Sequence, residues 1–314
     1  MKKKDKSIEQ VKRENRILEF LVGVLLVLVM LLAKDFLREN KFDRVEGYLC
    51  EKYYSPDNIE KAIRTKLGES VDEKDTQNEF ISANFDNYMI NLVLDDINKY
   101  EDEHLAKYNF YLRKEEAAGI LKQIGANQGI NVKELNDICY IKICDFTKRK
   151  TYPALRKYKD LYKSKTKYII DLRDNSGGSV DELVDVLSLF YPEGSIVYTV
   201  AWGSERKELK TSCEPLIEFD KIIILCNENT ASSSEMLMFN LKSDFPEKVQ
   251  FVGEKTYGKN FCYSYKEFSD GELLVFVSGI MGNRLGETFD MSGIVPDYQV
   301  EDKDALEFAK DLLK

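Results

Sequence analysis

Histidine is almost absent from this 314-residue chain, which contains only one, His104. A single histidine excludes a metal site built from several histidines of one chain, and it leaves only one way to pair serine with histidine. His104 ends the polar run Glu-Asp-Glu-His, which is typical of a solvent-exposed face rather than of a catalytic site. We therefore expect no metal ion and no cofactor.

Paired cysteine motifs are missing as well. The six cysteines contain no Cys-x-x-Cys pair, so nothing in the sequence supports a zinc ribbon or a thioredoxin-type site. An even number permits disulfides without showing them, and buried free thiols are the alternative that we favour. The cysteines are Cys50, Cys139, Cys144, Cys213, Cys226 and Cys262.

Basic residues are outnumbered, since 46 Lys and Arg stand against 55 Asp and Glu and give a net charge of −9. Residues 1–16 hold seven Lys and Arg and three Asp and Glu, so the remaining chain carries a charge of −13. Binding to nucleic-acid phosphates needs clustered basic residues. We therefore expect no nucleic-acid partner.

One long apolar run lies near the N-terminus. Residues 20–33 are apolar without a break and 17–18 extend the run, which is short of the roughly 20 residues that a spanning helix needs. Flanking Arg16 and Lys34 can reach the headgroups. We predict a basic cytoplasmic leader at 1–16 and a transmembrane anchor at 17–37, with the rest on the extracytoplasmic side of the cell membrane. A cleaved signal peptide and a buried core helix are the alternatives.

The pattern of predicted secondary structure changes near residue 138. Apolar periodicity predicts a mainly helical region over 38–137, whereas strands and helices alternate from 138 to 314 and indicate an α/β core with crossover connections. The predicted strands are 138–143, 168–172, 221–226, 249–253 and 272–278. The predicted helices are 152–162, 183–190 and 236–241.

Two strand-turn-helix junctions contain candidate catalytic groups. Paired glycines Gly177-Gly178 precede a helix, where free N–H groups can stabilise developing negative charge; a plain tight turn is the alternative. Ser232 begins a helix within the capping-box pattern Ser232-x-x-Glu235, so it is either a nucleophile in a positive field or only a helix cap. The pattern Ser179-x-x-Glu182 predicts a second capping box.

A third element is Lys259, which follows a strand and lies between small or aromatic residues. Burial lowers the pKa of a lysine, and a neutral amine can act as a base; an ordinary surface lysine is the alternative. In a chain with one unpromising histidine, a serine nucleophile needs another base, and Ser–Lys pairing is a known solution.

Together these stretches resemble the tail-specific, or C-terminal processing, serine peptidases. The matching runs are DLRDNSGG at 171–178, TASSSE at 230–235, GEKTYGK at 253–259 and Gly-Ile-x-Pro-Asp at 293–297. YIKICDF at 140–146 is similar to the family's first core strand, and the resemblance covers about residues 138–300. A weaker likeness to the family's N-terminal part lies at Tyr53-Tyr54 and at 108–116.

The resemblance implies a ClpP/crotonase-like core and a serine endopeptidase of proteins or peptides. It assigns Ser232 as nucleophile, Lys259 as general base, and the N–H groups of Ser233 and of Gly177 or Gly178 as the oxyanion hole. The reaction would pass through an acyl-enzyme. A non-catalytic relative that binds peptides or partners at the membrane is the main alternative. Acyl-CoA chemistry is less favoured, because no basic cluster lies near the glycine turn.

Three departures from the family pattern are visible. About twenty residues separate Glu116 from residue 138, too few for the PDZ domain that the family usually carries there, so we expect neither peptide capture nor gating by such a domain. Tyr263 occupies the position of a glutamine that orients the lysine in many members, and we expect its hydroxyl to substitute. About two extra residues near Phe245-Pro246 separate the serine and lysine motifs.

Overall fold

The computed structural model of the chain describes residues 129–202, 205–268 and 271–314, most of 103–117, and scattered positions between 45 and 101. The predicted leader and anchor, residues 1–16 and 17–37, lie outside these residues. No helix in the described part of the chain is long and apolar enough to cross a membrane. The membrane anchor thus stays a prediction.

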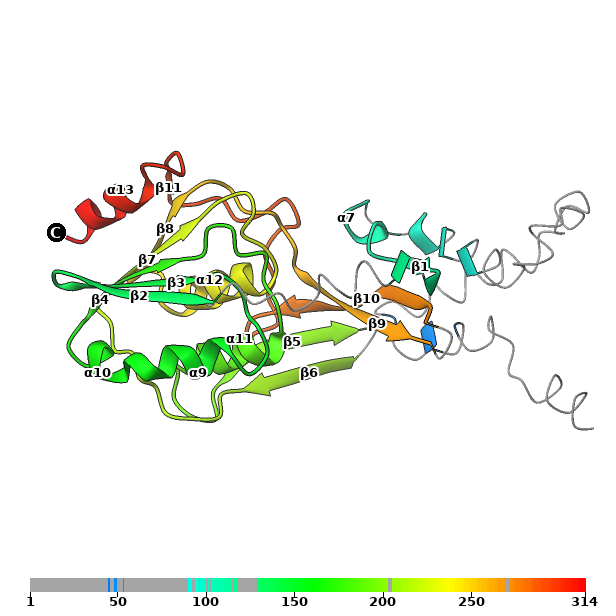
Figure 1. Cartoon of the computed structure of the whole chain (residues 1–314), viewed down its shortest axis with the longest axis horizontal. Helices are drawn as coiled ribbons and strands as arrows, with labels where there is room; N and C mark the ends of the chain where they lie inside the picture. The colour runs from blue at the N-terminus through cyan, green and yellow to red at the C-terminus, as the bar shows by residue number, and fades with distance from the viewer. Residues whose placement is uncertain are drawn as a thin grey trace, which may run out of the picture.

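A six-stranded sheet forms the centre of the fold (Figure 1), with the strand order β11-β8-β7-β4-β3-β2. All neighbouring pairs are parallel except β2 and β3. The central strands are mostly apolar and buried because both faces of a parallel sheet are covered. Their bounds are Ile130–Leu135 for β2, Ile138–Ile143 for β3, Lys167–Asp171 for β4, Lys221–Cys226 for β7, Val249–Gly253 for β8 and Tyr298–Gln299 for β11.

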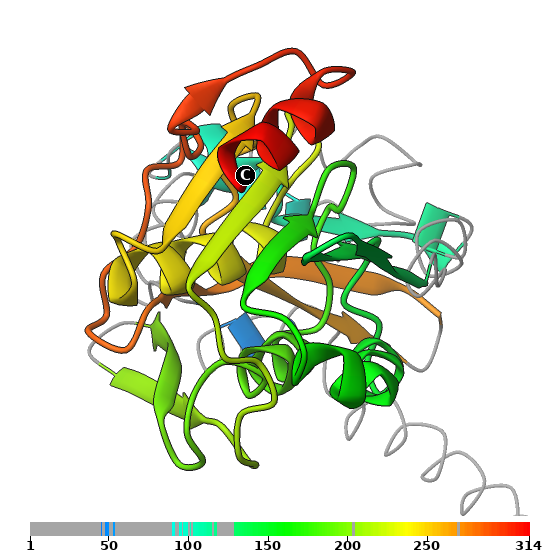
Figure 2. The ribbon, with the colours of Figure 1, turned by 90° about the vertical axis from the view of Figure 1, so that its left-hand side faces the viewer.

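Helices cover both faces of this sheet. One face packs Ile170, Ile222 and Ile224 into the main core with helices α11 and α12. The other face packs Ile169 and Ile223 against the C-terminal helix α13, which Figure 2 shows at the opposite side of the sheet from α12. The helices are α9 at Thr151–Leu155, the 3-10 turn η1 at Arg156–Tyr158, α10 at Lys159–Tyr162, α11 at Val180–Leu187, α12 at Ser233–Asp244 and α13 at Ala305–Leu312.

A second sheet is antiparallel and has the order β1-β10-β5-β6, with β9 also paired to β10. The β9–β10 hairpin extends away from the first sheet toward β1 and the short helix α7 at Glu103–Ala106 (Figure 1). The strands are β1 at Phe110–Leu112, β5 at Ile196–Trp202, β6 at Glu205–Lys210, β9 at Phe261–Glu267 and β10 at Leu273–Gly282.

The predicted strands and helices of the core are confirmed with small shifts of their ends. Two strands, β1 and β2, lie within residues 38–137. The expectation of a mainly helical region there stays a prediction, because most of its residues lie outside the described ones. β2 pairs with β3, and its residues largely alternate between half-buried and exposed. This pattern is typical of an edge strand covered on one side. β1 is only three residues long and depends on β10 for its pairing.

Cysteines agree with the expected free thiols. Five of the six belong to the described residues, and all five are free. Cys139 and Cys226 are buried, and burial raises the pKa of each thiol to about 12. Such thiols behave as small apolar side chains rather than as nucleophiles.

The capping box predicted at Ser179 is wrong. Ser179 begins α11 without a side-chain cap. The buried carboxylate of Glu182 accepts hydrogen bonds from two main-chain N–H groups of another helix start, those of Arg149 at 2.6 Å and Tyr152 at 2.5 Å. Glu182 therefore joins α11 to α9 instead of capping its own helix.

Replacing this carboxylate tests its structural role. We expect Glu182→Gln to lower the free energy of unfolding by about 2 kcal/mol, because an amide offers one acceptor oxygen and turns its NH2 group toward the second N–H donor. Urea unfolding measures the loss. Asp181→Asn is the matched control, since Asp181 forms an exposed ion pair with Lys148 that contributes little. Equal stability of the two variants would contradict the assignment.

Candidate active site

The predicted site residues meet because their loops follow neighbouring parallel strands. The glycine turn follows β4, the Ser232 loop follows β7 and the Lys259 loop follows β8, and these three strands are adjacent in the sheet. Loops after the carboxyl ends of adjacent parallel strands converge at one edge. Hydrogen bonds between the loops confirm this, from Ala231 N to Asn175 O at 3.0 Å and from Tyr257 N to Thr230 O at 3.0 Å.

Ser232 has a backbone conformation that a helix cap does not need. Its φ is 58° and its ψ is −119°, whereas N-cap residues ordinarily lie in the β region. A positive φ of this kind costs a non-glycine residue about 1–3 kcal/mol. A serine held on a strained turn between strand and helix is the geometry of a nucleophile elbow, so the arrangement favours the nucleophile over the simple cap.

The two neighbouring serines differ from Ser232. Ser233 and Ser234 are fully buried, and their hydroxyl groups donate to Gly178 O and to Asn175 O, each at 3.0 Å. Ser232 is half-buried. Both neighbours thus hold the turn to the Ser232 loop, and Ser232 is the serine left accessible.

The glycine turn lies directly against the Ser232 loop. Gly177 has a φ of 101°, and a Cβ there would lie 2.8 Å from Ser232 Cβ. Gly178 has a φ of 146°, and a Cβ there would lie 2.5 Å from Phe146 O. Both positions therefore require glycine, one because it touches Ser232 and the other because it touches the end of the first core strand.

The N–H groups of the predicted oxyanion hole are not equally available. Gly177 N donates to Asn175 Oδ1 at 2.9 Å. Over the described ranges no acceptor is bonded to the N–H of Ser233, which is the first residue of α12, or to that of Gly178. The geometry thus favours Gly178 over Gly177 as the partner of Ser233.

Lys259 is half-buried, not a surface lysine. Burial lowers the pKa of its amine to about 8, while the nearby Cys262 thiol and Glu235 carboxylate act in the opposite direction. Its Nζ lies 4.1 Å from the ring centroid of Tyr263 and 4.7 Å from that of Tyr108. Among the residues described, no hydrogen bond joins Lys259 Nζ to Ser232 Oγ.

Glu235 joins the serine and lysine loops. Its carboxylate is fully buried. Oε2 accepts from the main-chain N–H groups of Ser232 and Lys259, each at 2.8 Å. Oε1 accepts from Gly258 N at 2.7 Å and from the Thr256 hydroxyl. Because they share one oxygen, the main-chain nitrogens of Ser232 and Lys259 lie within two hydrogen-bond lengths of each other.

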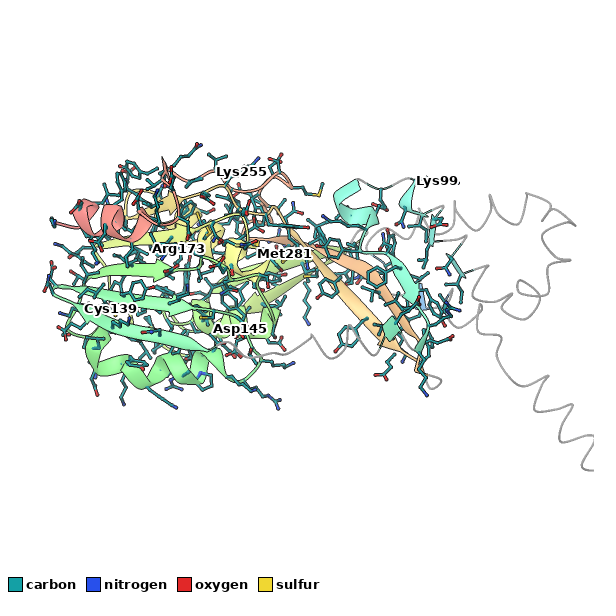
Figure 3. All side chains as sticks on the ribbon, turned by 45° about the horizontal axis from the view of Figure 1, so that its top comes forward. Lys99, Cys139, Asp145, Arg173, Lys255 and Met281 are labelled. Atoms are coloured by element: carbon teal, nitrogen blue, oxygen red, sulfur yellow. The ribbon has the colours of Figure 1, made fainter. Side chains whose placement is uncertain are left out.

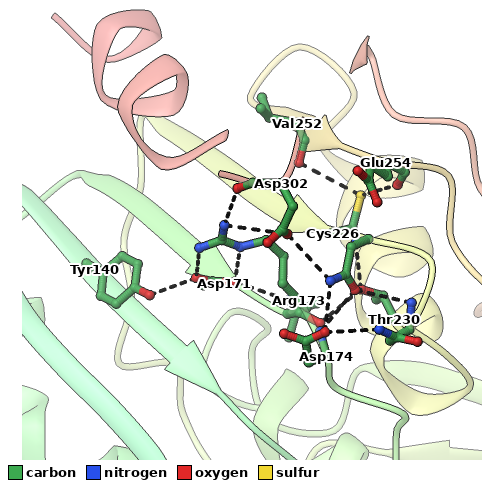
Figure 4. A network of polar contacts seen from close by, with 12 residues as sticks. Tyr140, Asp171, Arg173, Asp174, Cys226, Thr230, Val252, Glu254 and Asp302 are labelled. Atoms are coloured by element: carbon green, nitrogen blue, oxygen red, sulfur yellow. Dashed lines mark hydrogen bonds and ion pairs between the residues drawn. The ribbon is translucent and has the colours of Figure 1, made fainter. Parts of the chain in front are cut away.

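A polar network supports the glycine turn from behind (Figure 4). The buried Asp171 carboxylate accepts from Arg173 Nη2 at 2.6 Å and from Tyr140 OH at 2.7 Å. Although burial acts to raise it, these hydrogen bonds hold the pKa of Asp171 below its ordinary value. Asp174 and Asn227 exchange two 3.0 Å hydrogen bonds that connect the turn to the loop after β7.

The fourth motif, residues 293–297, supports the Lys259 loop. Thr256 N donates to Ile294 O at 3.1 Å, and Ile294 N donates to Thr256 Oγ1 at 2.8 Å. A Cβ on Gly293 would meet Thr256 O at 2.1 Å, and a Cβ on Gly258 would meet Met291 O at 2.0 Å. The glycines thus allow two backbones to touch, which fixes the loop that carries Lys259.

The contacts of two residues near the site, Glu235 and Tyr108, could not be predicted from the sequence. The pattern around Glu235 indicates a helix cap, and nothing in it shows that the same carboxylate also binds the lysine loop. Tyr108 comes from the segment before the core, and its motif likeness at 108–116 carries no role. His104, the alternative base, lies in α7.

Comparison with known proteins supports the predicted resemblance. The sequence model of peptidase family S41 matches residues 137–300. A probable CtpA-like serine protease of Staphylococcus epidermidis is 36% identical over 134 residues, which cover 42% of this chain and 27% of that protein. A carboxyl-terminal-processing protease of Synechocystis is 34% identical over 134 residues, covering 43% of this chain and 31% of that protein. The chain thus spans less than a third of the length of either relative.

The fold has a counterpart among solved structures. The photosystem II D1 C-terminal processing protease superposes with a TM-score of 0.61 at 13% identity, covering 83% of this chain and 92% of that one. At this identity the likeness concerns the fold alone. It confirms the predicted mixed α/β core.

The strain at Ser232 can be measured. We expect Ser232→Gly to be more stable than Ser232→Ala by about 1 kcal/mol, because glycine accepts a positive φ while alanine keeps the strained Cβ. Both variants lose the hydroxyl, so their difference in urea unfolding isolates the backbone. An alanine variant as stable as the glycine variant, or more so, would show that the turn is not strained.

Proposed function

Because this chain belongs to peptidase family S41, we propose that it is a serine endopeptidase in which Ser232 is the nucleophile and Lys259 is the general base. The observation that carries the proposal is the Glu235 carboxylate, which holds both loops at one point. The strain at Ser232 and the lowered pKa of Lys259 fit these roles. The ClpP/crotonase-like classification of the core belongs to the same proposal.

The reaction would run through an acyl-enzyme. Ser232 Oγ attacks the carbonyl carbon of a peptide bond while Lys259 Nζ takes its proton, and the N–H groups of Ser233 and Gly178 stabilise the oxyanion. The protonated amine then donates to the leaving nitrogen, and the C–N bond breaks. Lysine next takes a proton from water as the water oxygen attacks the ester. The C–Oγ bond then breaks, and the ammonium returns its proton to Ser232 Oγ. The flexible lysine side chain has to turn toward Oγ, since catalytic hydrogen bonds often tighten only with substrate bound.

The contact between Tyr263 and Lys259 differs from the one that the resemblance implies. We predict from the resemblance that its hydroxyl replaces a glutamine amide. Its ring face instead contacts the amine, with Nζ 4.1 Å from the centroid. A ring face attracts an ammonium group and shields it from water, so we propose that Tyr263 orients Lys259 through the ring.

The substrate class follows from the family. We propose that the chain cleaves proteins or peptides, and the names of its relatives make cleavage near a substrate's C-terminus the first specificity to examine. An anchor at 17–37 would place this activity at the extracytoplasmic face of the cell membrane. The alternative is a protein that binds peptides without cleaving them. We expect this outcome if the wild type cleaves no more substrate than the Ser232 and Lys259 variants described below.

Substitution of the dyad tests the proposal. We expect Ser232→Ala and Lys259→Ala each to reduce cleavage of an unfolded protein by at least about 10³-fold, because neither half of a nucleophile–base pair works alone. A fluorophosphonate probe should label Ser232, as read by peptide mass spectrometry. Lys255→Ala is the matched control, since Lys255 lies in the same loop with its side chain exposed (Figure 3). An inert wild type, or full activity in Ser232→Ala, would sink the assignment.

The pH dependence should report the lysine. A general base acts only as the free amine, so kcat/KM should rise about tenfold per pH unit below the pKa of Lys259 and level off above about 8. His104→Gln should keep the same profile, because the lone histidine has no part in it. A midpoint near 6.5, the ordinary histidine value, that disappears in His104→Gln would contradict the lysine base.

A further inference from the structure

Aromatic rings from two parts of the chain enclose the amine of Lys259. Tyr263 and Phe261 lie on β9, and their ring centroids are 4.1 and 5.7 Å from Nζ. The third ring, Tyr108, has its centroid 4.7 Å from Nζ and belongs to the segment between α7 and β1, ahead of the region matched by the family. Its ring meets Phe261 edge-on at 4.9 Å and stacks on Tyr263 at 6.0 Å.

Contacts that do not involve the lysine fix Tyr108 in place. Asn109, the next residue, is buried and its Oδ1 accepts from Val277 N on β10 at 2.9 Å. Phe110 then begins β1, which pairs with β10. On the other side, Tyr108 N donates to Leu105 O at 2.9 Å. The ring is therefore carried by a short segment built into the second sheet.

Lys107 and Tyr257 brace the same ring. Lys107 Nζ donates to the Tyr257 hydroxyl at 2.7 Å and lies 4.9 Å from the Tyr257 ring centroid and 5.5 Å from that of Tyr108. Tyr257 is two residues before Lys259, so the segment that carries Tyr108 contacts both the base and the loop that holds the base.

We propose that Tyr108 is a positioning residue for Lys259, which completes a three-ring wall with Phe261 and Tyr263 and keeps the amine dry beside the Ser232 loop. The inference rests on the proposed function in that Lys259 is taken as the base. A wall of this kind limits the rotamers of the lysine and keeps water from its amine. A residue from outside the family-matched region would thus help to position the general base.

The wall has two opposing effects on the protonation of Lys259. Burial favours the neutral amine and lowers the pKa of Lys259 to about 8, whereas ring faces favour the ammonium form. The charged and titratable groups that act on the amine are the Glu235 carboxylate on α12, the Cys262 thiol on β9 and the Lys107 ammonium after α7, and the rings of Tyr108 and Tyr263 contact it.

The test is the pKa of Lys259 in the full chain without turnover. In a Ser232→Ala background with isotope-labelled lysine, NMR titration follows the Lys259 signal, which Lys259→Arg identifies. We expect Tyr108→Leu to raise this pKa by about one unit, since water then reaches the amine. Tyr108→Phe keeps the ring and should leave it unchanged. With Ser232 restored, Tyr108→Leu should lower kcat/KM at pH 7 about tenfold and recover at high pH.

Tyr111→Leu is the matched control, because Tyr111 belongs to the same segment but packs on Phe268 and has no ring contact with Lys259 in the described part of the chain. It should leave the Lys259 pKa in place even if it lowers the melting temperature. If Tyr108→Leu fails to fold, the exposed Lys107→Met removes the brace and a facing cation, and it should raise the pKa by a smaller amount.

The outcomes separate this inference from the proposed function. An unchanged Lys259 pKa in Tyr108→Leu, or in Lys107→Met where the leucine variant does not fold, overturns the positioning role. An equal shift in Tyr111→Leu overturns it too, because loosening the segment would then suffice. The titration uses an inactive protein, so an inert wild type would sink the peptidase assignment while leaving the result on Tyr108 intact.

Discussion

The buried carboxylate of Glu235 is the interaction on which the site depends. An anion removed from water costs several kcal/mol unless its oxygens are fully hydrogen-bonded, and here four donors reach it from the Ser232 loop and from residues 256–259. Burial still raises its pKa, so the charge is retained only while those donors stay in place. Moving either loop would therefore leave an unsatisfied buried group, and this holds Ser232 and Lys259 in place together.

Much of the fold could be predicted because its central strands are buried on both faces. Lys221–Cys226 is an apolar run that only a covered parallel strand explains, and its bounds are confirmed. Strand β6 at Glu205–Lys210 is charged and exposed, so its sequence gives no apolar alternation from which to predict it. Strand β9 begins inside the base loop, where glycine and aromatic residues conceal it. These strands exist because of pairing partners far along the chain.

The site, like the fold, has a part that could be predicted from the sequence and a part that could not. Ser232, Lys259 and the glycine turn carry motifs, since their roles require particular residue types at fixed spacing. The part of Tyr108 has no such signature, because an aromatic ring before β1 is ordinarily core, and only the 4.7 Å approach to Lys259 gives it meaning. Likewise, Gly177 N is bonded to Asn175 while Gly178 N has no acceptor among the described residues, and this depends on the conformation of the turn, not on the residue types.

Using lysine as a base places a demand on the surrounding protein that histidine does not. An imidazole titrates near neutral pH unaided, whereas an exposed lysine amine stays protonated to about pH 10. A general base at Lys259, as we propose, requires that water be kept from the amine, and the rings of Phe261 and Tyr263 contact it from β9. Tyr108 adds a ring from another segment, with its centroid 4.7 Å from Nζ. In the proposed mechanism, the scarcity of histidine and the contact between the N-terminal segment and the Lys259 loop are parts of one physical solution.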